Sequence, residues 1–171
     1  MHKLACVLLL LIILLIPARA QNEVNYAVHA NIIYRFTKYI KWPSDKKTGD
    51  FVIGIVGNSP LYDELKSYVV NKTVGTQRIV LRMFSSSSST YNCHILFISE
   101  NAGRSLKRIK LATEGTPTLL VSEGDGLAIK GSCINFIVVD EHLKLEINKN
   151  NIEEKDLSIA SDLLSLGILV K

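Results

Sequence analysis

The sequence lacks the motifs of the common enzyme active sites. Four histidines and three cysteines occur in 171 residues, and they form neither the H-E-x-x-H nor the C-x-x-C pattern of zinc sites. A G-x-S-x-G elbow, a complete G-x-G-x-x-G and the G-K-[ST] of a P-loop are also absent. Cys93 and His94 are adjacent on an expected strand, so they point to opposite faces and cannot ligate one metal ion. The sequence therefore predicts a protein that is not an enzyme and has no cofactor or metal site.

A strong excess of one charge is lacking as well. Lysine and arginine number 20 against 16 acidic residues, which gives a net charge of +4. Nucleic-acid-binding proteins concentrate basic residues on one face, so this balance predicts no nucleic-acid partner. Arg104, Lys107, Arg108 and Lys110 do cluster. The solvent-facing side of an amphipathic helix explains this cluster most simply, and contact with an acidic partner surface is the alternative.

Long hydrophobic runs are missing except at the start of the chain. Leu4 to Ile16 is an apolar run of thirteen residues, followed by Pro17 and the small-x-small sequence Ala18-Arg19-Ala20. A membrane-spanning helix needs about 20 apolar residues, whereas a secretory signal peptide has this shorter pattern. We predict a cleaved signal peptide over residues 1–20 and one domain over 21–171, exported to the periplasm. An uncleaved N-terminal anchor is the alternative.

Cysteine is scarce, and its placement agrees with export. Cys6 lies in the expected signal peptide, which leaves Cys93 and Cys133 in the domain. A pair of cysteines in an oxidising compartment predicts a disulfide, here closing a loop of about 40 residues. Two buried free thiols are the alternative.

Hydrophobic periodicity predicts the secondary structure. Apolar residues spaced by three and four predict a helix from Val24 to Lys41, which Pro43 ends. Strands and helices that alternate are typical of parallel βαβ units. We predict an α/β three-layer sandwich: a mixed, mostly parallel sheet with helices on both faces and a C-terminal hairpin. The Ser85–Thr90 run predicts a flexible surface loop. Strands are expected over 51–56, 78–84, 93–98, 118–121, 134–139 and 143–147. Further helices are expected over 102–112, over 152–166 and from Pro60 onward, the last with Leu61, Leu65, Tyr68 and Val69 on its apolar face.

Aromatic residues are few and gather at the end of the first helix. Tyr34, Tyr39 and Trp42 lie within nine residues. Such side chains are enriched in interfaces and ligand pockets, and they are also common in cores. With Arg104 and Arg108 they form our candidate partner-binding set.

Seven segments of the chain, taken in order, form a recognisable pattern. They are NIIYRFTKYIKWP (31–43), FVIGIVG (51–57), CHILFIS (93–99), TPTLLVS (116–122), INF (134–136), LEIN (145–148) and IASDLL (159–164). Together they resemble the YfiR family of periplasmic regulators, over residues 26 to 169. One departure is Gly131-Ser-Cys-Ile-Asn135, which puts Cys133 where this family commonly has methionine. Another is Leu166-Gly167, where its usual ending is L-A.

This resemblance implies a function through protein contacts. Founding members of the family are periplasmic repressors that bind the sensor portion of an inner-membrane diguanylate cyclase, and cyclic-di-GMP rises when envelope or redox stress relieves the repression. Other relatives accompany membrane sensors such as histidine kinases. The family is commonly dimeric, so the resemblance also implies a homodimer. A periplasmic small-molecule-binding protein is the alternative function, and a hydrolase with an unusual site is a third.

Overall fold

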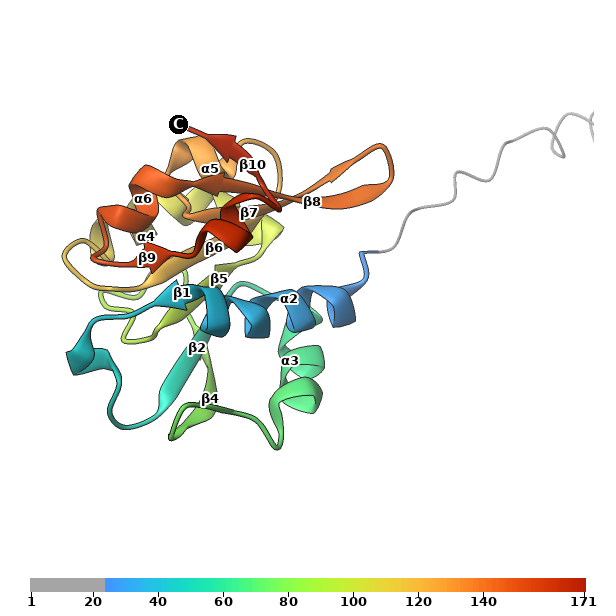
Figure 1. Cartoon of the computed structure of the whole chain (residues 1–171). Coiled ribbons are helices and arrows are strands. Elements are labelled where there is room, and N and C mark those ends of the chain that lie inside the picture. Colours follow the sequence, from blue (N-terminus) through green and yellow to red (C-terminus); the bar gives the residue numbers. More distant parts are fainter. Residues whose placement is uncertain (1–23) are drawn as a thin grey trace, which may run out of the picture.

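An eight-stranded mixed sheet lies between two layers of helices (Figure 1). The computed structural model describes residues 24–171, so the expected signal peptide and Cys6 lie outside the described residues. The strand order is β10-β8-β7-β6-β5-β2-β4-β3. The strands of this sheet are β2 (Phe51–Val56), β3 (Thr73–Val74), β4 (Gln77–Phe84), β5 (Ile95–Ile98), β6 (Leu119–Glu123), β7 (Ile134–Val139), β8 (His142–Asn148) and β10 (Ile168–Val170).

The middle of the sheet is parallel and its margins are mixed. Strands β4, β2, β5, β6 and β7 pair in parallel, whereas β8 pairs with β7 antiparallel and β10 pairs with β8 in parallel. Strand β2 is buried along its whole length, as expected for a parallel strand with helices on both sides. The predicted α/β three-layer sandwich with a mixed, mostly parallel sheet is confirmed.

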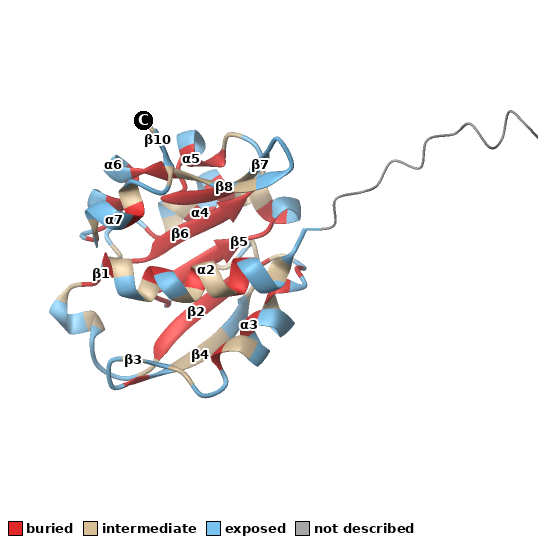
Figure 2. Ribbon diagram, turned by 45° about the vertical axis from the view of Figure 1, so that its right-hand side comes forward, coloured by how far each residue is buried: buried red, intermediate tan, exposed pale blue. Residues whose placement is uncertain are grey.

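Helices cover both faces of this sheet. Helix α2 crosses one face (Figure 2) and packs against α3, while η2, α4 and α5 lie on the other. Asn25 caps α2, because its side chain accepts a hydrogen bond from the Val28 N–H at 3.3 Å. The helical elements are α2 (Tyr26–Tyr39), η1 (Ser44–Lys46), α3 (Leu61–Val69), η2 (Glu100–Ser105), α4 (Leu106–Ala112), α5 (Leu127–Lys130), α6 (Lys149–Glu153) and α7 (Ser161–Leu164).

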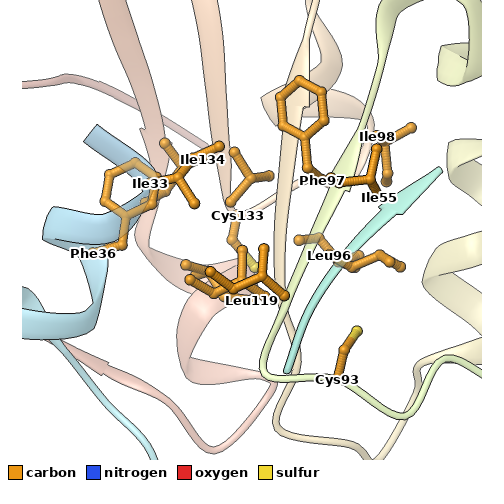
Figure 3. Close-up of a cluster of buried hydrophobic side chains, with 14 of the residues drawn as sticks. Ile33, Phe36, Ile55, Cys93, Leu96, Phe97, Ile98, Leu119, Cys133 and Ile134 are labelled. Atoms are coloured by element: carbon orange, nitrogen blue, oxygen red, sulfur yellow. The ribbon is translucent and has the colours of Figure 1, made fainter. Parts of the chain in front are cut away.

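The core lies between α2 and the central strands. Ile33 and Phe36 of α2 are fully buried, and Figure 3 shows them beside Ile134 of β7. The Phe36 and Phe136 rings lie 6.3 Å apart, so aromatic packing joins the helix to this strand. Among the described residues, no helix is both long and apolar enough to cross a membrane.

The predicted C-terminal hairpin is confirmed, with β7 and β8 joined at Asp140 and Glu141. Both turn residues have positive φ values, 50° and 63°, as in the type I′ turn that matches the twist of paired strands.

The predicted helix over 152–166 is wrong. This segment is divided among α6, a two-residue strand β9 (Ser158–Ile159), α7 and the approach to β10. Asp156 has a left-handed φ of 53°, which a helix does not accommodate. Ile159 pairs with Ile40 of β1 (Ile40–Lys41) in a separate two-stranded sheet. The first helix also ends earlier than predicted, at Tyr39 instead of Lys41, because Ile40 and Lys41 form β1.

Candidate functional site

A cavity of about 480 Å³ lies where β2 and β4 begin. Its walls come from the end of α2, from β1 and η1, and from the turn between β3 and β4. We call it the Trp42 pocket. Its apolar lining residues are Ile40, Trp42, Phe51 and Val74, and its charged lining residues are Lys38, Lys41, Lys46 and Lys47.

Trp42 belongs to the core and also contributes to the pocket wall. It is 7% exposed, and its indole N–H donates to the carbonyl oxygen of His94 at 3.3 Å. The indole stands edge-on to Phe51, with ring centroids 5.1 Å apart and an interplanar angle of 87°. Of the two interpretations of this residue, core or interface, the structure places it in the core with one edge at a cavity.

His94 holds the segment that carries two of the pocket lysines. Its Nδ1 accepts a hydrogen bond from the Val52 N–H at 3.0 Å, so Nε2 carries the ring hydrogen and donates to the Lys46 carbonyl at 2.9 Å. Burial is the largest cause of its lowered pKa, which keeps the ring neutral. The side-chain NH₂ of Gln77 donates hydrogen bonds to the carbonyl oxygens of Lys46 at 3.0 Å and Thr48 at 3.3 Å. The loop before β2 is therefore fixed to the first residue of β4 and to the residue that precedes β5.

The pocket has a strongly positive lining. None of its lining residues is acidic, and none of the four lysines forms a salt bridge with a residue in the range 24–171. The nearby Asp50 is paired with Arg78 at 3.3 Å. Apolar walls of low dielectric strengthen the field of such a cluster. The arrangement is suited to an anionic group attached to an apolar one.

Tyr34 and Tyr39 lie near the pocket but do not line it. Tyr34 packs edge-on against Tyr68 of α3 at 5.8 Å, and the Lys38 and Lys72 ammonium groups lie 5.8 and 5.6 Å from its ring centre. Cation–π attraction thus positions Lys38 at the rim. Tyr39 is half-buried, and its carbonyl accepts a bond from the Ala160 N–H at 2.9 Å.

The two arginines of the candidate set lie on η2 and α4, on the other face of the sheet. The Arg108 guanidinium donates to the Ser88 carbonyl and to the Tyr91 hydroxyl, both at 3.0 Å. It therefore holds the serine-rich loop in place. Arg104 is exposed and lines a different cavity, together with Glu100 and Glu123. The five predicted residues do not form one site.

The structure holds Cys93 and Cys133 as two free, buried thiols, contrary to the expected disulfide. Strand β6 lies between them. On one side the Leu119 N–H donates to the carbonyl of His94, the neighbour of Cys93, and on the other side the Cys133 N–H donates to the Leu120 carbonyl. Two strand spacings amount to about 10 Å, more than the roughly 7 Å that a disulfide spans between Cα atoms. Figure 3 shows the two side chains apart.

His94 and Gln77 position the loop that carries Lys46 and Lys47, and the sequence reasoning missed this role. His94 was considered only as a metal ligand, and Gln77 was not considered. The available signal for His94 was a polar side chain next to the apolar run Ile95–Ile98, and Gln77 gave no comparable signal, because its strand also contains Arg78 and Arg82. Buried polar groups of this kind are nearly always hydrogen-bonded, so they indicate a structural contact.

Comparison with known protein families gives a match over most of the described chain. A family model described as YfiR/HmsC-like matches residues 26–168. The match begins at the first residue of α2 and ends at the first residue of β10, so it includes every element around the Trp42 pocket. No curated protein matches the chain.

Proposed function

Because the chain belongs to the YfiR/HmsC-like family, we propose that it is a non-enzymatic periplasmic regulator that binds the periplasmic part of a membrane signalling protein. The family suggests regulation of diguanylate cyclase signalling, and the partner is a diguanylate cyclase or a sensor kinase. The family match over residues 26–168 is the observation that carries this proposal. Modulation by protein contact requires a recognition surface, and the Trp42 pocket supplies a candidate.

The chemistry of the pocket defines what the partner presents. Unpaired lysines around an apolar floor complement an acidic segment with an apolar side chain among its carboxylates. Charge of this kind accelerates association and selects the partner, while the apolar floor contributes to affinity. Trp42 forms part of this surface, Tyr34 and Tyr39 lie near it, and Arg104 and Arg108 lie outside it.

Capture from membranes tests the proposal. The wild-type protein serves as bait for detergent-solubilised membranes, and mass spectrometry identifies what it retains. A bait with Lys41→Glu and Lys47→Glu reverses two exposed charges of the pocket. A control bait with Lys66→Glu and Lys144→Glu changes charge equally on other exposed surfaces. Trp42→Ala is unsuitable, because removing a buried tryptophan costs about 3–5 kcal/mol of folding free energy.

The expected result is one membrane sensor with a periplasmic domain, retained by wild-type and control baits and lost from the pocket variant. Retention of that sensor by all three baits would remove the pocket from the proposal. Recovery of no membrane sensor by the wild-type bait would contradict the regulator function.

The size of the Trp42 pocket favours a second function, periplasmic small-molecule binding. Ligand pockets typically enclose about 300–1,000 Å³, and this cavity has about 480 Å³. A thermal-shift screen of anionic aromatic and aliphatic compounds tests it. Compounds that stabilise the wild type but not the Lys41→Glu, Lys47→Glu variant would support this function.

We also propose that the protein forms a homodimer through the sheet edge at β10. Leu166, Ile168 and Leu169 are exposed there, and an apolar edge strand can pair with a second copy. Light scattering coupled to size exclusion measures the mass. A dimer that dissociates in Leu169→Lys is expected, and a wild-type monomer at micromolar concentration would refute the proposal.

A further inference from the structure

A second cavity, of about 420 Å³, lies beside α4 on the face of the sheet opposite α2. Four lysines from three parts of the chain line it, together with two glutamates. We call it the Lys155 cavity. Its charged lining residues are Lys107, Lys110, Lys130, Lys155, Glu114 and Glu154.

Lys155 is buried without an ionic partner. The residue is 5% exposed, and its ammonium donates to the carbonyl and the hydroxyl oxygen of Thr113, at 2.9 and 3.1 Å. It forms no salt bridge with any residue that the structure describes. An ammonium has three hydrogens to donate, and a buried charge is costly unless it is paired. Two neutral oxygens leave the third hydrogen and the charge uncompensated.

The other lysines increase the positive charge. Lys110 is held by Glu154 at 3.4 Å and by the Asn151 side-chain oxygen at 3.2 Å. Lys107 and Lys130 are exposed and have no salt-bridge partner among residues 24–171. Three ammonium groups of the lining therefore lack a carboxylate partner.

We propose that the Lys155 cavity binds a small dianion of the phosphate type, either inorganic phosphate or a soluble phosphomonoester. Lysine ammonium groups bind phosphate as point charges, and a dianion accepts bonds from several of them at once. Such an anion supplies the missing partner of Lys155 and offsets the repulsion among the lysines. This inference does not depend on the proposed regulatory function, because the Trp42 pocket lies elsewhere.

The titration of Lys155 agrees with an anion site. Burial and the neighbouring Lys110 lower its pKa, while Glu154 and Glu114 raise it. The adjacent Cys133 thiol is neutral at physiological pH, since burial raises its pKa to about 11. A bound dianion favours the charged ammonium, so affinity is expected to weaken as pH rises through the lowered pKa of Lys155.

Calorimetric titration of the purified protein with inorganic phosphate tests the proposal, with chloride holding the ionic strength constant. Lys155→Met keeps the length and apolar character of the side chain but removes its charge. We expect it to weaken phosphate binding by roughly tenfold or more, as for loss of a charge-assisted hydrogen bond. The control Lys144→Met, on the exposed hairpin, is expected to bind as the wild type does.

A second variant distinguishes loss of phosphate binding from misfolding. Lys107→Met with Lys130→Met changes only exposed side chains and is expected to weaken phosphate binding while leaving the melting temperature without phosphate unchanged. Sulfate should compete with phosphate. Binding that chloride abolishes at equal ionic strength, or equal phosphate affinity in all variants, would overturn the proposal.

Phospholipid headgroups carry the same phosphate chemistry, so vesicles form a separate arm. A lysine that is 5% exposed lies too deep for phosphates held in a membrane surface. We therefore expect no Lys155-dependent cosedimentation with phosphatidylglycerol vesicles. Cosedimentation that Lys155→Met abolishes would overturn the assignment to a soluble anion.

Discussion

Nδ1 of His94 accepts a hydrogen bond from the backbone N–H of Val52 at 3.0 Å. This bond fixes the ring so that Nε2 donates to the Lys46 carbonyl at 2.9 Å. One neutral imidazole thus joins the first strand of the parallel sheet to the loop that carries Lys46 and Lys47. Protonation of Nδ1 would place two hydrogens face to face, so the geometry requires a neutral ring.

The stability of the protein is expected to fall as pH decreases below about 6.5, the ordinary pKa of histidine. Burial lowers the pKa of both His94 and His29 in the folded state. A lowered folded-state pKa gives stability that is present above the unfolded-state pKa and is lost as pH falls through the folded value. Each such histidine contributes up to about 1.4 kcal/mol per pH unit in that window. Urea unfolding at pH 7.5, 6.5 and 5.5 measures the effect.

His94→Gln separates the two histidines, because glutamine offers one acceptor and one donor without titrating. The variant is expected to lose part of the dependence on pH between 7.5 and 5.5, with His29 causing the remainder. Identical pH dependence in the wild type and in His94→Gln would show that folding does not lower the pKa of His94.

The contrast between β2 and the C-terminal segment shows what the sequence could predict. Phe51 to Val56 is an unbroken apolar run, and a strand buried on both faces has that pattern, so its bounds were predicted correctly. Residues 152–166 have apolar spacing compatible with a helix. Their structure depends on the pairing of Ile159 with Ile40, which joins residues more than one hundred positions apart and leaves no local pattern.

The same limit applies to the Trp42 pocket. The sequence drew attention to Trp42 and the two tyrosines before it. Lys46 and Lys47 join Lys38 and Lys41 at the pocket through a loop that His94 and Gln77 hold from 48 and 31 residues away. Arg108 has a structural role that its place on an amphipathic helix did not indicate. We predicted it as a candidate for partner binding, and its side chain also contacts the serine-rich loop of its own chain.

Reductant is expected to leave the melting temperature unchanged. Cys93 and Cys133 are free, and burial raises the pKa of these thiols to about 12 and about 11. Little reactive thiolate therefore forms in the folded protein near neutral pH. In protein lacking residues 1–20, a thiol reagent at pH 8 should label both cysteines after denaturation and neither in the native state. If the two cysteines formed a disulfide, its reduction would lower the melting temperature by several degrees.

Arg108→Ala is expected to loosen the loop formed by Ser85 to Thr90. The guanidinium bonds to Ser88 and to the Tyr91 hydroxyl, and that hydroxyl in turn donates to the Ser85 and Ser86 carbonyls. The contacts lie near the surface, so global stability should fall by less than about 1 kcal/mol. Limited proteolysis should cleave the loop several-fold faster than in the wild type. Lys107→Ala, on the same helix, should leave the cleavage rate unchanged, and equal rates in the two variants would contradict this role.

Glu123→Gln is expected to gain stability relative to the wild type as pH rises from 4 to 7. Oε1 of Glu123 accepts bonds from the Glu100 N–H at 3.1 Å and the Tyr26 hydroxyl at 3.3 Å, and glutamine keeps an acceptor there. Burial, with a contribution from the charge of Glu100, raises the pKa of Glu123 above its usual 4.5. A raised folded-state pKa gives stability that is present below the unfolded-state pKa and is lost as pH rises through the folded value. The neutral variant avoids that loss. Urea unfolding of both proteins at pH 4, 5.5 and 7 measures the difference, with the exposed Glu64→Gln as control. A difference that stays constant across this range would mean that the carboxylate is as stable in the folded protein as in water.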